Sequence, residues 1–149
     1  VTIGTASYRD FTLGQQIDTM RRSLIGNLNA IKTDANSGVK APASCVGSLT
    51  GYRVSFDVNA TSVGSTTRAR GFSVYTLCPT TPNLVKRISF SNANESVIIN
   101  RTVANANFTF KPVQSGTNIQ TGNPIIITVS NSSTPRVGTI TINESGEIQ

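Results

Sequence analysis

Apolar residues near the N-terminus recur every third or fourth position. They follow one another as Leu13, Ile17, Met20, Leu24, Leu28, Ile31 and Ala35. A stripe of this period lies along one face of an α-helix. Ser7 and Asp10 have the spacing of a capping box at its start. The segment 36–38, Asn-Ser-Gly, is a stop signal, and Pro42 prevents a restart. The sequence therefore predicts an amphipathic helix over residues 8–37.

Beyond Cys45 the period of the pattern changes to two. In the stretch "TGYRVSFDV", Tyr52, Val54 and Phe56 alternate with polar residues, as in a half-buried strand. Further strands are predicted at 69–78, 84–90, 96–103 and 106–113, with Phe108 and Phe110 pointing inward, and a polar loop at 59–68. The segment 123–149 is typical of a hairpin followed by a tight turn and a short last strand. The fold class is therefore α+β: a single domain over 1–149, with a long N-terminal α-helix (8–37) packed on antiparallel β-sheet (48–149).

Composition agrees with a folded strand-and-turn protein. The chain has 149 residues, enough for one domain with a core; 37% are apolar and 13% charged. These fractions exclude a disordered chain. The net charge of +6 arises partly from having only seven acidic residues. Since no Lys/Arg-rich run exists, the charge is diffuse.

The chain contains two cysteines, Cys45 and Cys78, and no histidine. Without a Cys-x-x-Cys pair or a histidine, a zinc site is disfavoured. A disulfide between them is the favoured interpretation and implies an oxidising compartment outside the cytosol. The alternative is that they are unrelated buried thiols.

Catalytic chemistry is not indicated. Without histidine, neither a Ser-His-Asp nor a Cys-His arrangement can be built. The acidic residues are scattered, and no glycine-rich phosphate loop occurs. We therefore expect a non-enzymatic protein with no catalytic residue, metal site, cofactor or small-molecule substrate.

Four basic residues are candidates for nucleic-acid contact: Arg68, Arg70, Lys86 and Arg87, on neighbouring predicted strands. If the strands pair, some of these side chains form a patch for phosphate groups. Lys86 and Arg87 are adjacent and should point to opposite faces. The alternative is that all four are solvated strand residues that keep an edge soluble.

Several segments together resemble a known family. They are "LNAIKTDANSGVKAPASC" at the passage from helix to sheet, "GYRVSFD", "FTFKPVQSGTN" with Phe110, Pro112 and Gly116, and "GTITINESGEI" with Gly146. In these features the chain resembles type IV pilin-like proteins, and within them the minor pilins and minor pseudopilins of the GspH/FimT group. It departs from the family at the start, where the apolar membrane-spanning half of the pilin helix and its cleavage site are missing.

The resemblance implies a type IV pilin-like fold and a structural role in a bacterial type IV pilus (fimbrium) or type II secretion filament. A missing N-terminal segment would anchor the subunit in the inner membrane, with its domain in the periplasm or outside the cell. Other pilin or pseudopilin subunits would be its partners through the helix.

The helix face expected to serve assembly consists of Leu13, Ile17, Met20 and Leu24. The part from Leu24 to Ala35 is expected to pack on the sheet. The part from Tyr8 to about Met20 is expected to project and expose Leu13, Ile17 and Met20, unless these pack on a larger sheet.

Two other functions remain open. One is a DNA-binding minor pilin acting in DNA uptake through Arg68, Arg70, Lys86 and Arg87. The other is a secreted β-rich adhesive module that binds carbohydrate or protein, as in cell adhesion. Its 6% aromatic residues and lack of Trp offer little material for stacking on sugars.

Overall fold

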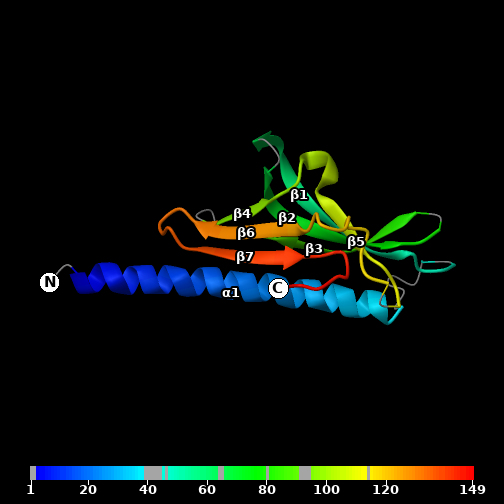
Figure 1. Ribbon diagram of the computed structural model, residues 1–149, viewed down its shortest axis with the longest axis horizontal. Coiled ribbons are helices and arrows are strands. Elements are labelled where there is room, and N and C mark those ends of the chain that lie inside the picture. Colours follow the sequence, from blue (N-terminus) through cyan, green and yellow to red (C-terminus); the bar gives the residue numbers. More distant parts are fainter. Residues whose placement is uncertain are drawn as a thin grey trace.

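The computed structural model describes residues 3–38, 45, 47–63, 66–79, 81–90, 95–113 and 115–149. Helix α1 (Ile3–Asn36) lies lengthwise along an antiparallel sheet (Figure 1). The strands of the sheet are β1 (Gly51–Val63), β2 (Thr66–Leu77), β3 (Pro82–Ser89), β4 (Glu95–Ile99), β5 (Asn107–Phe110), β6 (Ile125–Asn131) and β7 (Val137–Ile142), with a 3-10 turn η1 (Val103–Asn105) before β5. This arrangement confirms the predicted α+β class.

Strand β2 lies at the centre of the sheet, whose order is β5-β1-β2-β4-β6-β7. One edge of β2 pairs with β1. The other edge is shared, because residues 67–69 pair with β4 and residues 71–77 pair with β3. Gly71 is the residue at which the neighbouring strand of β2 changes from β4 to β3. A Cβ atom at Gly71 would collide with the backbone oxygen of Ile88 in β3, so β3 can approach β2 here only because the residue has no side chain.

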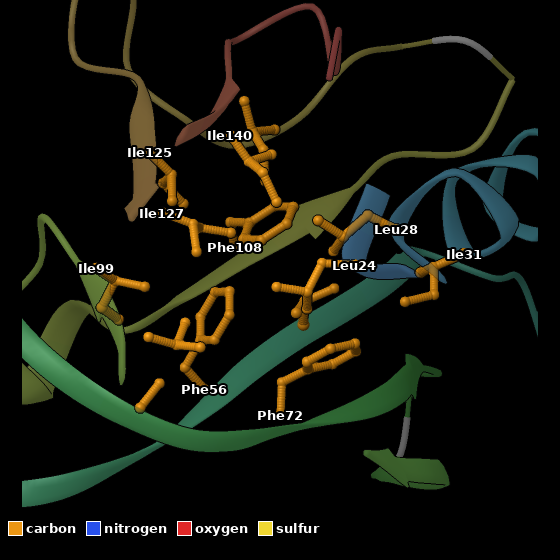
Figure 2. Packing of buried hydrophobic residues seen from close by; sticks show 14 of the residues in the cluster. Leu24, Leu28, Ile31, Phe56, Phe72, Ile99, Phe108, Ile125, Ile127 and Ile140 are labelled. Carbon is orange, nitrogen blue, oxygen red and sulfur yellow. The ribbon is translucent and has the colours of Figure 1, made fainter. Parts of the chain in front are cut away.

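The core lies between α1 and the face of the sheet that the helix covers (Figure 2). Leu24, Leu28 and Ile31 point into it from α1, as predicted for the C-terminal part of the stripe. The sheet contributes the side chains at every second position of its strands, which point inward. They include Val54, Phe56, Phe72, Val74, Ile99, Phe108, Phe110, Ile125, Ile127, Ile140 and Ile142. The rings of Phe56 and Phe72 meet edge to face with centroids 5.9 Å apart. The inward orientation predicted for Phe108 and Phe110 is confirmed.

The helix ends where the sequence predicts but begins earlier. The N–H of Ser37 donates to the carbonyl of Thr33, and Gly38 adopts a left-handed φ of 66° that closes the last turn. At the other end the predicted capping box is wrong, because α1 already includes Ile3 and Asp10 lies within it. With 34 residues the helix is about 51 Å long. Pro42 lies outside the described residues.

The hairpin that joins β1 and β2 is longer than predicted. The polar segment 59–68 was expected to be a loop, but β1 continues to Val63 and β2 begins at Thr66. The register pairs Ser62 with Thr67 and Val63 with Thr66. Backbone hydrogen bonds hold these pairs together. Because the segment is largely polar, its sequence lacks the alternation of apolar residues from which a strand is predicted.

The predicted C-terminal hairpin is confirmed. Strands β6 and β7 pair antiparallel, from Ile125 opposite Ile142 to Ser130 opposite Val137. The short last strand is present as a bridge between Ile142 and Ile148. This end of the chain therefore continues the sheet alongside β7.

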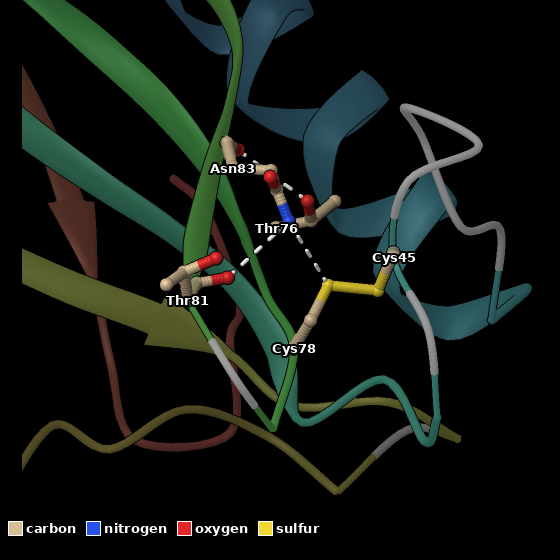
Figure 3. Close-up of a disulfide and its surroundings, with 5 residues drawn as sticks. All are labelled: Cys45, Thr76, Cys78, Thr81 and Asn83. Atoms are coloured by element: carbon tan, nitrogen blue, oxygen red, sulfur yellow. Dashed lines mark hydrogen bonds between the residues drawn. A yellow bond between two sulfur atoms is a disulfide. The ribbon is translucent and has the colours of Figure 1, made fainter.

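The predicted disulfide is also confirmed. Cys45 and Cys78 are bonded, with their Cα atoms 5.6 Å apart. The bond joins the segment after α1 to the end of β2 (Figure 3). Asn83 lies beside it, and its Nδ2 atom donates to the Sγ of Cys78 at 3.6 Å and to the carbonyl of Thr81 at 3.2 Å. A disulfide of this kind implies an oxidising environment.

Candidate functional site

The helix face predicted to serve assembly is largely covered by the sheet. Ile17 and Leu24 are each only 3% exposed, Met20 is partly buried against the core, and Leu13 is half-buried. The expectation that Leu13, Ile17 and Met20 are exposed is therefore wrong, and the alternative of a larger sheet holds. Ile17 and Leu24 in particular are not available to a partner.

Strand β7 is the physical reason for this burial, because it runs alongside α1. Gly138 faces the helix, and a Cβ atom placed on it would lie 3.1 Å from the Cγ2 of Ile17. The missing side chain thus lets the two elements approach closely. One turn further along α1, the Nε of Arg21 donates to the carbonyl of Thr139 at 2.8 Å.

Polar contacts extend this packing toward the N-terminus of α1. Asp10 forms an ion pair with Arg136 at 3.2 Å and accepts a hydrogen bond from the hydroxyl of Thr134 at 2.8 Å. The turn between β6 and β7 therefore reaches α1 at Asp10. Beyond that point the N-terminal end of the helix extends past the sheet (Figure 1).

An exposed aromatic pair lies on α1 on either side of Asp10. Tyr8 is 74% exposed and Phe11 is 55% exposed. Residues three apart lie on the same side of a helix, so the two rings form one surface. We call Tyr8 and Phe11 the aromatic pair. Sequence reasoning missed it because neither residue belongs to the apolar stripe, although their spacing was a usable signal.

A groove lies on a different side of α1, between the helix and the sheet. It encloses about 360 Å³ and is lined by Gln16, Thr19, Met20, Ser23, Leu24 and Asn27 of α1 and by Ile88, Ser89, Phe90 and Glu95. The apolar part of its lining comes from Met20, Leu24, Ile88 and Phe90, and the other lining residues are polar. We call this cavity the helix–sheet groove.

The four basic residues predicted as a nucleic-acid patch are exposed but divided. Strands β2 and β3 are neighbours, as expected. Lys86 lies opposite the core residue Val74, whereas Arg87 lies opposite Ser73 on the other face, which confirms their predicted divergence. Arg68 lies further along β2, where its Nη2 donates to the carbonyl of Glu95 at 3.4 Å. The structure therefore does not bring the four cations into one patch.

Instead, Arg87 shares the outer face of the sheet with Arg53, which sequence reasoning missed. The guanidinium of Arg53 lies over the ring of Tyr75, 5.1 Å from its centroid. Beside Tyr75 on this face is Ser73, which is 1% exposed. The Oγ of Ser73 and the Nε of Arg53 are both buried without a hydrogen-bond partner. We call Arg53, Ser73, Tyr75 and Arg87 the outer arginine cluster. Its donors suit an oxyanion such as a phosphate group.

The alternation in "GYRVSFD" was the signal that could have identified Arg53. Since Tyr52 and Val54 face the core, Arg53 must lie on the outer face. Its neighbour Tyr75 could not be identified, because strand register is not visible in one sequence.

Among the described residues, Arg101 is the one basic residue whose guanidinium donates hydrogen bonds to several carbonyl groups. Its guanidinium donates to the carbonyls of Asn100 at 2.8 Å, Asn123 at 2.6 Å and Pro124 at 3.1 Å. Burial lowers the pKa of Arg101, but arginine remains charged under physiological conditions. Its donors hold the loop before β6, so we assign it a structural role.

The segments that carry the family resemblance meet at the C-terminal end of α1. Gly116 and Gly146 both have left-handed backbones, with φ of 74° and 80°. The N–H of Thr117 donates to the carbonyl of Glu144 at 2.8 Å, which joins the two segments. Together with Phe110 and Lys32 of α1 they enclose a small cavity of about 310 Å³.

Comparisons with protein-family models, curated proteins and solved structures find no match to this chain. Within the described ranges, no helix is long and apolar enough to cross a bilayer. No three Cys, Asp or Glu side chains of the described residues lie close enough together to hold a metal ion. The surface features that could contact a partner are the aromatic pair, the helix–sheet groove and the outer arginine cluster.

Proposed function

We propose that the chain is a non-enzymatic structural subunit of a bacterial filament, of the type IV pilus or type II secretion kind. The observation that carries the proposal is the aromatic pair on a helix whose apolar stripe already packs on the sheet. Large aromatic side chains that are exposed in a single copy gain most by burial against a partner. Tyr8 and Phe11 thus replace the buried stripe as the assembly face.

Further features support the proposal. The β6–β7 turn meets α1 at Asp10, and the helix end before it, which includes Tyr8, extends past the sheet, where neighbouring subunits can reach it (Figure 1). The disulfide suits a domain that works outside the cytosol. The resemblance to minor pilins and pseudopilins adds an inner-membrane anchor upstream of Val1 and a location in the periplasm or on the cell surface.

Replacing Tyr8 and Phe11 together with alanine is expected to reduce incorporation of the subunit into filaments by about tenfold or more. Each buried ring contributes roughly 2 kcal/mol, and about 1.4 kcal/mol corresponds to a factor of ten. The measurement is the amount of variant in sheared filaments or in the secretion complex, relative to the cellular amount. Arg22→Ala, also exposed on α1, is the matched control and should assemble normally. Normal assembly of the double variant would reject the aromatic pair as the assembly face, and absence of the natural chain from the filaments would overturn the filament function.

A second candidate function, DNA binding, is favoured by the outer arginine cluster. Arg53 and Arg87 flank Ser73 on one face, and no ion pair neutralises either guanidinium within the described structure. We expect duplex DNA to bind at low salt and to dissociate as salt rises, because bound phosphates release counterions. In a mobility-shift titration, Arg53→Gln with Arg87→Gln should lower the salt slope by about 2, roughly 0.9 for each phosphate contact. Arg22→Gln should leave it unchanged. Absence of binding at low salt would exclude this function.

A further inference from the structure

We propose that the aromatic pair of one copy inserts into the helix–sheet groove of a second copy, so that the chain associates head to tail. This inference rests on the proposed filament function and names the surface that each subunit offers to the next. Both surfaces belong to the same chain, and they lie on different sides of α1.

The sizes of the two surfaces agree. A protein cavity of about 150 Å³ accommodates a benzene molecule. The groove encloses about 360 Å³, so there is room for the rings of Tyr8 and Phe11.

The chemistry of the two surfaces is complementary. The groove presents Met20 and Phe90, and both thioether sulfur and aromatic rings make favourable contacts with an incoming ring. Glu95 also lines the groove, and its carbonyl accepts a hydrogen bond from the Nη2 of Arg68. The complementarity of the two surfaces is therefore that of apolar and aromatic side chains.

The positions of the surfaces on α1 determine the kind of assembly. The aromatic pair is centred between residues 8 and 11, and the helical lining of the groove between residues 16 and 27. At 1.5 Å and 100° per residue, the centres differ by about 18 Å along the axis and by roughly a third of a turn around it. When copies keep their helices parallel, this contact repeats without closing. A head-to-tail contact that does not close generates a helical filament.

Cysteine cross-linking tests the contact in the whole chain. Since Cys45 and Cys78 are bonded to each other, an introduced cysteine is the single free thiol. We would mix a Phe11→Cys chain with an isotope-labelled Ser23→Cys chain, which places one thiol in each surface and keeps Tyr8, and oxidise mildly at high concentration. Mass analysis distinguishes mixed dimers from dimers of either chain. Mixed dimers should exceed both, and should exceed those formed by Phe11→Cys with Arg22→Cys by roughly tenfold.

Each other outcome counts against the contact. Predominant Phe11→Cys homodimers would indicate a symmetric contact between aromatic pairs. Equal yields with Ser23→Cys and Arg22→Cys would indicate random collision, and absence of mixed dimers from folded chains would exclude the groove.

The two proposals can fail separately. Loss of filaments in the Tyr8/Phe11 variant without mixed dimers would retain the filament function and reject the groove. Mixed dimers together with normal filaments in that variant would retain the contact and reject its role in the filament.

Discussion

Replacing Leu28 with alanine is expected to lower the free energy of unfolding by about 2–5 kcal/mol. Leu28 is fully buried and points from α1 into the core (Figure 2). Alanine has the highest helix propensity, so the substitution cannot weaken the helix itself. The whole loss would therefore report the packing of α1 on the sheet, including the cavity that remains. Urea-induced unfolding followed by circular dichroism measures it.

The neighbouring residue supplies a matched control. Asn29 is exposed, and Asn29→Ala changes the same helix to the same residue on its outer side. It should leave the free energy of unfolding unchanged or raise it by a few tenths of a kcal/mol, through helix propensity alone. If the Leu28 and Asn29 variants unfolded at the same urea concentration, the packing of α1 described above would be wrong.

Replacing both Cys45 and Cys78 with alanine is expected to lower the free energy of unfolding by about 2–4 kcal/mol. The disulfide closes a loop between residues 33 positions apart, which restricts the unfolded chain far more than the folded one. The same bond holds the segment after α1 against the end of β2. Equilibrium unfolding in urea compares the variant with the oxidised natural chain.

Chemical reduction distinguishes the contribution of the disulfide bond to stability from that of the cysteine side chains. The natural chain treated with a reductant should unfold at about the same urea concentration as the double alanine variant, because both lack the cross-link. If the reduced chain kept the stability of the oxidised one, the bond would not contribute. If only the alanine variant lost stability, the loss would belong to the packing of Cys45, which is 6% exposed.

The periodic parts of the fold were visible in the sequence. The apolar stripe of α1 and the alternation in β5, β6 and β7 depend only on which side of each element is buried, and this recurs at fixed spacing. The helix stop was visible because Gly38 adopts a backbone conformation that other residues avoid.

The start of the helix and the extent of its burial were not visible. Asp10 looked like a capping residue, but it pairs with Arg136, far away in the chain. Gly138 lets β7 approach Ile17, and nothing local to either residue indicates the other. The outer arginine cluster likewise depends on register, which places Ser73 opposite Arg87. Such contacts follow from the tertiary arrangement and not from local pattern.

The lengthwise packing of α1 on the β6–β7 hairpin has a mechanical consequence. A pulling force along the helix axis would load the contacts of Ile17, Leu24 and Leu28 simultaneously, in shear, instead of peeling them apart one by one. The disulfide joins Cys45, which follows the helix in the sequence, covalently to the end of β2, the central strand. The lifetime of the domain under tension would then be governed by its rate of forced unfolding. Such a domain can bear tension applied at its N-terminal end.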